Sequence, residues 1–271
     1  FMRSKIIGMQ HWTDSALGNY LLQWEQQRCD EAVADIFGYH SLQLGMPMLQ
    51  ALRSNRMPDR WLALDSSALQ DWQAVRRLGN VPSSELPIPS VLVTAPEALP
   101  FAEKSLDLVV LPHTLETCED PHAVLREAAR VLMPEGRLVV CGLNPMSLMG
   151  VQRRLERRTP YLPGIGWGVG YWRLRDWLSL LALDIEAVQF GCYRPATQSE
   201  QWLKRWEFLD RWGHKGWPVL GGVYCVVAVK RVVGMRLIEP SWRSGAAPKG
   251  SPVMASKEAA AQPVSSQQGD L

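Results

Sequence analysis

The chain has 271 residues, of which 46% are apolar, and a formal net charge of +2 at pH 7. This length allows one larger domain, or one domain with appendages. The near balance of charge excludes an overall field that would attract the protein to nucleic acid or to an acidic membrane. No apolar run approaches the ~20 residues that cross a bilayer, and the first residues lack a secretory signal pattern. We therefore expect a cytoplasmic protein without a transmembrane segment.

The five cysteines are scattered along the chain and show no CxxC spacing. An odd number without such spacing argues against a disulfide framework and against a zinc site. We expect no metal, and cysteines that pack as small hydrophobic side chains. The five are Cys29, Cys118, Cys141, Cys192 and Cys225.

The first half of the chain predicts a helix followed by four strands. Residues 15–36 place Leu17, Leu21 and Val33 at helical intervals among polar residues, within an N-terminal helical segment at 1–36. The fourth predicted strand, LDLVVLP, is a continuous apolar run, which is typical of a strand buried on both faces of a parallel sheet. The predicted strands are 40–45, 61–67, 90–95 and 106–112.

Asp120 and Pro121 stand where an N-cap and a first-turn proline belong, and the following residues to Leu132 carry one apolar face. MPEG then predicts a turn, and a fifth buried strand starts at Gly136. Strand, helix and strand with short connections form the unit that builds parallel sheets. The predicted fold class is therefore α/β.

The last part of the chain predicts a basic helix, VQRRLERR, then a helix and a strand within 173–193, and a final strand at 223–232. Between these two strands lies a tryptophan-rich insertion at 193–222. The main domain is expected at 37–233. A tail at 234–271, poor in large apolar residues from residue 241 onward, is expected to be disordered.

The stretch from Val91 to Pro145 resembles the central segment of class I S-adenosylmethionine-dependent methyltransferases of the type 11 branch, and bacterial members of this layout with an altered glycine-rich motif. The family has an LPF turn, S-x-D-L-V-V, a histidine loop, R-V-L-x-P-G-G and a strand, in that order. The matching parts are Leu99-Pro100-Phe101, Ser105 to Val110, His113, Arg130-Val131-Leu132 and Pro134-Glu135-Gly136.

This resemblance implies a doubly wound, mostly parallel sheet of seven strands with an antiparallel last strand, and S-adenosylmethionine as cofactor. Ligands of such sheets bind at the carboxyl ends of the strands, near the point where the strand order reverses. The resemblance therefore implies a set of cofactor-binding candidates at the strand ends: Gln43, Gly45, Asp65, Ser66, Ala95, Pro96, Glu97 and Leu111.

The glycine-rich motif departs from the family's pattern. Gln43 stands where an acid is usual, Pro47 replaces the second glycine, and Ala95 cannot meet the adenine amino group as an acid would. Proline fixes φ and removes an amide donor. We therefore expect the cofactor to bind more weakly than in relatives with two glycines.

Each singled-out residue also has a structural interpretation. Gly45 could simply end a strand, and Asp65 could cap the helix that follows it instead of binding the ribose. His113, at the catalytic edge, is the candidate general base, although a lone loop histidine is more often structural.

The tryptophans of the insertion allow three interpretations. Trp202, Trp206 and Leu209 show an amphipathic spacing. Packing on the core ranks first, a lid over an apolar substrate second, and contact with a membrane surface third.

The leading function is methyl transfer from S-adenosylmethionine to a small or medium-sized acceptor, which needs positioning more than an obvious base. The alternative is a non-catalytic binding or regulatory protein that keeps the fold. A nucleic-acid methyltransferase ranks third, because Asn144-Pro145 begins an amino-methylating motif but Met146 and Ser147 follow where an aromatic residue belongs.

Overall fold

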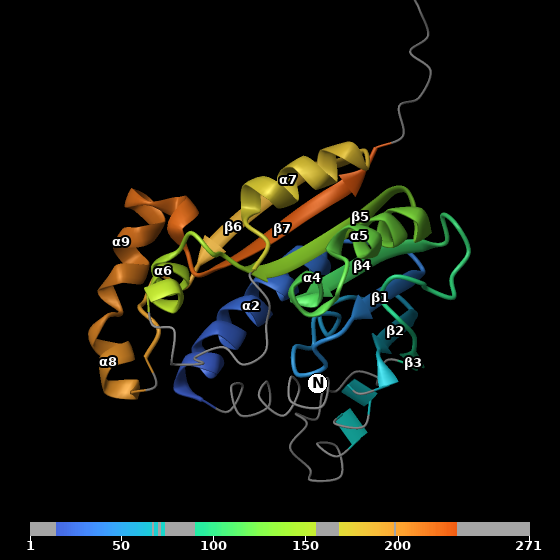
Figure 1. The fold of residues 1–271 in the computed structure, drawn as a ribbon. Helices are drawn as coiled ribbons and strands as arrows, with labels where there is room; N and C mark the ends of the chain where they lie inside the picture. The colour runs from blue at the N-terminus through green and yellow to red at the C-terminus, as the bar shows by residue number, and fades with distance from the viewer. Residues whose placement is uncertain are drawn as a thin grey trace, which may run out of the picture. The chain divides into compact units, whose positions relative to one another are not determined.

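The computed structural model describes residues 15–66, 68–69, 72–73, 90–155, 168–197 and 199–231. Contacts divide the chain into two units, Phe1–Val232 and Val233–Leu271. The second unit, and with it the predicted disordered tail, lies outside the described residues. Figure 1 draws the described part as a coloured ribbon.

A seven-stranded sheet forms the centre of the first unit, in the order β3-β2-β1-β4-β5-β7-β6. The strands β3, β2, β1, β4 and β5 pair in parallel, and β7 pairs antiparallel with both β5 and β6. The predicted mostly parallel sheet with an antiparallel last strand is therefore confirmed. The strands are β1 (His40–Leu44), β2 (Asp59–Leu64), β3 (Ser90–Val93), β4 (Leu106–Pro112), β5 (Leu132–Leu143), β6 (Leu183–Gly191) and β7 (Val223–Lys230).

Two helices, α2 and α5, begin at residues whose side chains cap them. Helix α5 starts at Pro121 because Asp120 accepts hydrogen bonds from the amides of His122 and Ala123 at 2.9 and 3.0 Å. Helix α2 starts after Ser15, whose hydroxyl accepts from the amide of Gly18. In the described part of the chain the helices include α2 (Ala16–Ala34), α4 (Thr114–Thr117), α5 (Pro121–Val131), α6 (Leu148–Leu155), α7 (Tyr171–Leu180), α8 (Glu200–Arg205) and α9 (Phe208–Gly216), with a 3-10 turn η1 (Pro218–Leu220).

The predicted MPEG turn falls inside β5 and interrupts its pairing with β4. Leu106 pairs with Leu132 but Leu108 pairs with Arg137, so the intervening residues loop out. Glu135 takes a positive φ of 64° at this point. The turn prediction therefore holds locally, although the strand begins before it.

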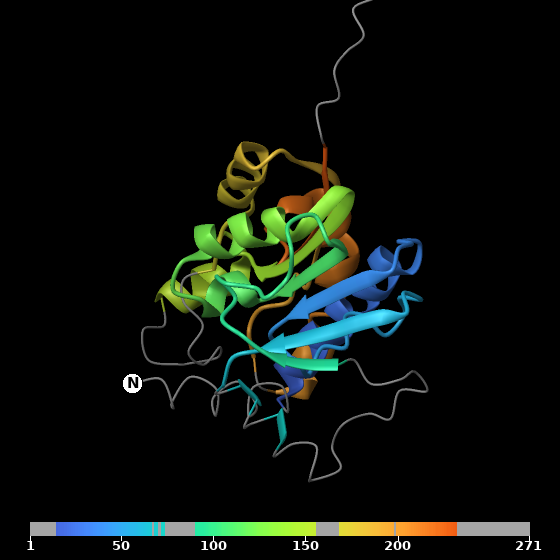
Figure 2. The ribbon, with the colours of Figure 1, turned by 90° about the vertical axis from the view of Figure 1, so that its right-hand side faces the viewer.

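Alternate residues of the central strands feed two hydrophobic clusters on opposite faces of the sheet. Leu108 and Val110 pack with α2 on one face, while Val109 and Leu111 pack with α5 and α7 on the other. Figures 1 and 2 show this layering of helices around the sheet. Burial on both faces explains why β4 carries no polar alternation.

Four of the five cysteines are buried in this packing, as expected for small hydrophobic side chains. The sulfur of Cys141 lies 3.5 Å from that of Cys29 and 3.6 Å from that of Cys225. All five are free thiols, and Cys118 is half-buried.

The crossover between β1 and β2 differs from a usual βαβ unit. Residues 45–58, all of them described, form turns and no helix. Side chains bind this crossover to α2: Gln26 and Gln50 exchange two hydrogen bonds of 3.0 Å, and Asn55 donates to the carbonyl groups of Val33 and Ile36. Helix α2 thus covers the face that a crossover helix would otherwise cover.

Candidate functional site

The carboxyl ends of β1, β2 and β3 lie side by side at one edge of the sheet. The amide of Gly45 donates to the carbonyl of Ala63 at 2.8 Å, and the amide of Thr94 donates to Leu64 at 3.0 Å, so the ladders continue past the strand ends. Strand order reverses between β1 and β4, and open α/β sheets bind their ligands at such a point. This edge is therefore the candidate cofactor site.

Gly45 ends β1 in a conformation that suits glycine. Its φ is +74°, and a Cβ added there would meet only the hydroxyl of Thr114, at 3.6 Å, so the space beside it is open. The same hydroxyl donates to the carbonyl of Leu44 at 2.6 Å. The next residue, Met46, also has a positive φ, of 37°. The backbone at Gly45 is thus held by β2 and, through Leu44, by Thr114 of α4, and it leaves room for a ligand.

Gln43 turns its side chain into the crossover. Its amide nitrogen donates to the carbonyl groups of Gly45, Met46 and Leu49, and its oxygen accepts from the amide of Ala51 at 3.0 Å. The residue is buried. A glutamine that satisfies four backbone groups holds the loop in shape, and its polar atoms are already engaged by the protein.

Asp65 and Ser66, the predicted residues after β2, are exposed. One carboxylate oxygen of Asp65 accepts from the amide of Ala68 at 2.6 Å, and Ser66 begins a helical stretch. The helix cap proposed from the sequence is therefore present. It does not exclude ribose binding, because a carboxylate has about four lone-pair sites.

The remaining cofactor candidates differ in exposure. Ala95 is exposed, and Pro96 and Glu97 are half-buried, in a turn closed by a hydrogen bond of 2.7 Å from the Thr94 hydroxyl to the carbonyl of Ala98. Leu111 is completely buried in the hydrophobic cluster under α5 and α7. Leu111 therefore supports the strand end from inside.

His113, the candidate general base, lies between two buried carboxylates. Its Nε2 atom is 2.7 Å from Oε1 of Glu25 in α2, and its Nδ1 atom is 2.9 Å from Oε2 of Glu116 in α4. The three side chains are at most 1% exposed. The other oxygen of Glu116 accepts from the amide of Leu143 at the end of β5. This cluster, Glu25, His113 and Glu116, joins α2, β4 and β5.

Burial alone would lower the pKa of His113, but the carboxylates of Glu25 and Glu116 outweigh it and raise the pKa well above its usual value. A protonated ring with both nitrogens engaged has no lone pair with which to accept a proton. These surroundings favour the structural interpretation of His113 over general-base catalysis.

Sequence reasoning missed Glu25 and Glu116 as partners of His113. A signal for Glu25 was present, because it interrupts a stripe of buried residues spaced by four, Leu17, Leu21, Cys29 and Val33. An acid inside an apolar stripe of a helix requires a buried partner. Glu116 follows His113 by three residues on the same short helical turn.

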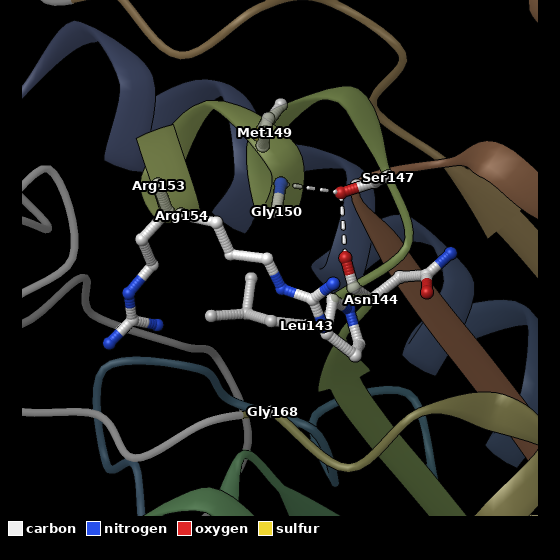
Figure 3. Close-up of a pocket in the computed structure, with 10 residues that line it drawn as sticks. Leu143, Asn144, Ser147, Met149, Gly150, Arg153, Arg154 and Gly168 are labelled. Atoms are coloured by element: carbon white, nitrogen blue, oxygen red, sulfur yellow. Dashed lines mark hydrogen bonds between the residues drawn. The ribbon is translucent and has the colours of Figure 1, made fainter. Parts of the chain in front are cut away.

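A small hollow of about 30 Å³ lies at the carboxyl end of β5. Asn144 and Ser147 shape it: the hydroxyl of Ser147 donates to the Asn144 carbonyl at 2.7 Å and accepts from the amide of Gly150 (Figure 3). The Asn144 side chain donates to the carbonyl groups of Val219 and Gly221. Asn144 thus fixes the loop before β7, a different task from the base recognition of an amino-methylating motif.

The tryptophan-rich insertion forms two separate helices, so its aromatic residues do not lie along one helical face. Helix α8 ends at Arg205 and α9 begins at Phe208, so Trp206 and Leu209 do not continue the face of Trp202. Trp202, Trp212 and Trp217 are 52%, 70% and 53% exposed. Core packing, the interpretation ranked first, is therefore wrong for these three residues.

The described residues contain neither a metal-binding cluster nor a membrane-spanning helix. No group of three or more histidine, cysteine or acidic side chains there is arranged to hold a metal ion. In the same part of the chain, no helix has the length and apolar character that crossing a bilayer requires.

Comparison with known proteins identifies related sequences. A family model described as "Methyltransferase domain" matches residues 47–140. The Escherichia coli (strain K12) protein YafS is 30% identical over 236 residues, which cover 86% of this chain and 85% of YafS.

Solved structures share the fold at low identity. An S-adenosylmethionine-dependent methyltransferase from Thermotoga maritima is 13% identical with a TM-score of 0.56, covering 84% of this chain and 97% of its own. One from Mesorhizobium loti is 14% identical with a TM-score of 0.51, covering 75% and 96%. The [4+2]-cyclase SpnF is 14% identical with a TM-score of 0.51, covering 76% and 80%, so this architecture alone does not assign a reaction. The matched family model, the YafS relationship and the ordered motifs together show that the chain belongs to the class I S-adenosylmethionine-dependent methyltransferases, in the type 11 branch.

Proposed function

We propose that this protein transfers a methyl group from S-adenosylmethionine to a small or medium-sized acceptor, and that the cofactor binds at the carboxyl ends of β1, β2 and β3. The observation that carries the proposal is Gly45. It combines a positive φ, open space beside its Cα and a place at the strand-order reversal of a sheet that belongs to this family. The non-catalytic alternative gains no support from any of these features.

The residues at this edge fit S-adenosylmethionine in their chemistry. The cofactor would lie over the backbone of Gly45, with the exposed carboxylate of Asp65 accepting from the ribose hydroxyls. The turn of Ala95, Pro96 and Glu97 would face the adenine. Bound there, S-adenosylmethionine supplies an activated methyl group on a sulfonium.

Other residues act on the shape of the site. Gln43 holds the loop that follows Gly45, and Leu111 supports the end of β4 from the core. We assign His113 a positioning role, because its ion pairs connect α2 to the two strand ends that border the site. Methyl transfer by in-line displacement depends mainly on orientation and exclusion of water, so it does not require His113 to accept a proton.

The acceptor would enter at the carboxyl end of β5, on the side where α6, α8 and α9 lie (Figure 1). The hollow of about 30 Å³ there holds no more than a few water molecules, so an acceptor must displace surrounding side chains. A lid formed by this insertion over an apolar acceptor stays a prediction of the sequence.

Calorimetric titration with S-adenosylmethionine and S-adenosylhomocysteine tests the cofactor assignment, and two variants of Asp65 separate its two roles. Asn caps a helix about as well as Asp. Asp65→Asn should therefore keep the free energy of unfolding but lose affinity if the carboxylate holds the ribose, each lost hydrogen bond being worth about 0.5 to 1.5 kcal/mol. Asp65→Ala should lose the same affinity and also about 1 kcal/mol of stability.

Asp59 provides the matched control, because it is an exposed acid at the opposite end of the same strand. Asp59→Asn should bind the cofactor as the wild type does. Unchanged affinity in Asp65→Asn would leave Asp65 as a helix cap only. No heat with either ligand, in wild-type protein shown to be folded, would refute the proposed function.

A further inference from the structure

Helix α9 carries its aromatic and cationic side chains on the outside. Phe208, Arg211, Trp212 and Lys215 follow one another at intervals of three, one and three residues, which places them on one face of the helix. All four are exposed, Trp212 to 70%. We call these four residues the outer face of α9. Its amphipathic pattern is the reverse of a helix that packs its aromatic residues on a core.

The opposite side of α9 is fixed to the body of the protein. Asp210 accepts hydrogen bonds from the hydroxyl of Tyr20 in α2 at 2.7 Å and from the amide of Tyr193 at 3.0 Å, and pairs with Arg194 at 2.8 Å. Gly213 lies against the ring of Tyr193 so closely that a Cβ there would come within 2.4 Å of it. These contacts hold the outer face toward solvent and oppose the rotation that would turn its aromatic residues over the site.

The charges around α8 and α9 suit an anionic partner. Four exposed basic side chains stand against two exposed acids, Glu200 and Glu207, since Asp210 is engaged on the inner side. Glu207 lies 4.0 Å from Arg211. Exposed Trp202 and Trp217 flank the helix, with Arg205 over the ring of Trp202 at 5.6 Å. The basic residues are Lys204, Arg205, Arg211 and Lys215.

We propose that the outer face of α9, together with Trp202 and Trp217, docks onto the surface of an anionic lipid membrane. Indole rings have an apolar body and a polar N–H, and they favour the level of the lipid headgroups. Basic side chains between them attract anionic headgroups, and a short helix lying in the interface needs no membrane-spanning length. Helix α9 lies beyond the carboxyl end of β5 in Figure 1, so a membrane at its outer face would meet the protein near the proposed acceptor entrance. The docking itself does not depend on methyl transfer.

Flotation of the full chain with vesicles tests this proposal. We expect binding to vesicles of phosphatidylcholine mixed with phosphatidylglycerol, weak binding to phosphatidylcholine alone, and a decline with added salt. Neutralising two cations by Arg211→Gln with Lys215→Gln should reduce the partition coefficient about thirty-fold, since each basic residue near an anionic surface contributes about a factor of five. Phe208→Ala with Trp212→Ala should also reduce binding strongly.

Trp172 gives a matched control, because it is 51% exposed like Trp202 but lies on α7, over the other face of the sheet. Trp172→Ala should float with the vesicles as the wild type does, and all variants should keep the wild-type unfolding midpoint. Equal binding to neutral and anionic vesicles, or none to either, would overturn the proposal. If the wild-type protein did not bind vesicles but formed a dimer that Trp212→Ala abolished, the outer face of α9 would be assigned to contact with a second copy of the chain. If Phe208→Ala with Trp212→Ala instead lost cofactor affinity or turnover in solution, the outer face of α9 would be assigned to a lid over the site.

Discussion

Replacing His113 with glutamine tests whether this histidine is a structural cation. The change leaves the carboxylates of Glu25 and Glu116 facing one side chain without positive charge, in a place where all three groups are at most 1% exposed. Removing one partner of a buried ion pair typically costs about 3–5 kcal/mol, against a total stability of about 5–15 kcal/mol for a typical domain. We therefore expect His113→Gln to lower the free energy of unfolding at pH 7 by about 3–5 kcal/mol.

Urea titration followed by tryptophan fluorescence measures this loss. His40→Gln is the matched control, since His40 lies 3.1 Å from Asp59 but the two side chains are 42% and 53% exposed. That variant should lose no more than about 1 kcal/mol. A His113→Gln protein as stable as the wild type, but inactive, would refute the structural role and restore the general base.

Two further predictions concern the same part of the molecule. Gln43→Leu should lower the free energy of unfolding by about 2–4 kcal/mol in urea titration, because buried backbone groups of the crossover lose their partners; an unchanged midpoint would show that the loop finds other partners. In the wild type, the raised pKa of His113 should make stability fall as the pH rises. The contribution is complete below the unfolded pKa of about 6.5 and declines by up to about 1.4 kcal/mol per pH unit until the pH passes the folded pKa. Urea midpoints from pH 6 to pH 9 measure this slope, which His113→Gln should lack and which a flat profile would contradict.

The sequence predicted correctly those helices and strands that are determined by interactions between residues close together in the chain. Strand β4 is a continuous apolar run that both faces of the sheet bury, and it spans Leu106–Pro112 as expected. Helix α5 begins where Asp120 and Pro121 predict, because a side-chain cap acts on amides two and three residues away. In both cases the interactions that decide the structure lie within a few residues of the pattern.

The crossover after β1 and the partners of His113 could not be predicted in this way. Gln43 looked like a lost acid, yet its side chain satisfies four backbone groups of a loop whose path depends on α2. Glu25 meets His113 across 88 residues of sequence. The core-packing prediction for the tryptophan-rich insertion failed for a related reason. Helical spacing is the same whether a tryptophan such as Trp212 is exposed or buried. The contacts of Asp210 with Tyr20 and Tyr193 determine which face of α9 turns outward.

The missing crossover helix changes how the cofactor must be recognised. A helix that starts after the glycine-rich loop directs unpaired amides and the positive end of its dipole at a ligand. Here turns replace that helix between Gly45 and β2, and Pro47 offers no amide. In the proposed binding mode, the carboxylate of Asp65 would therefore carry a larger share of the binding free energy than it would beside a complete loop. The comparison of Asp65→Asn with Asp59→Asn therefore tests the site directly, because asparagine keeps the cap on the helical stretch that begins at Ser66 and removes only the negative charge.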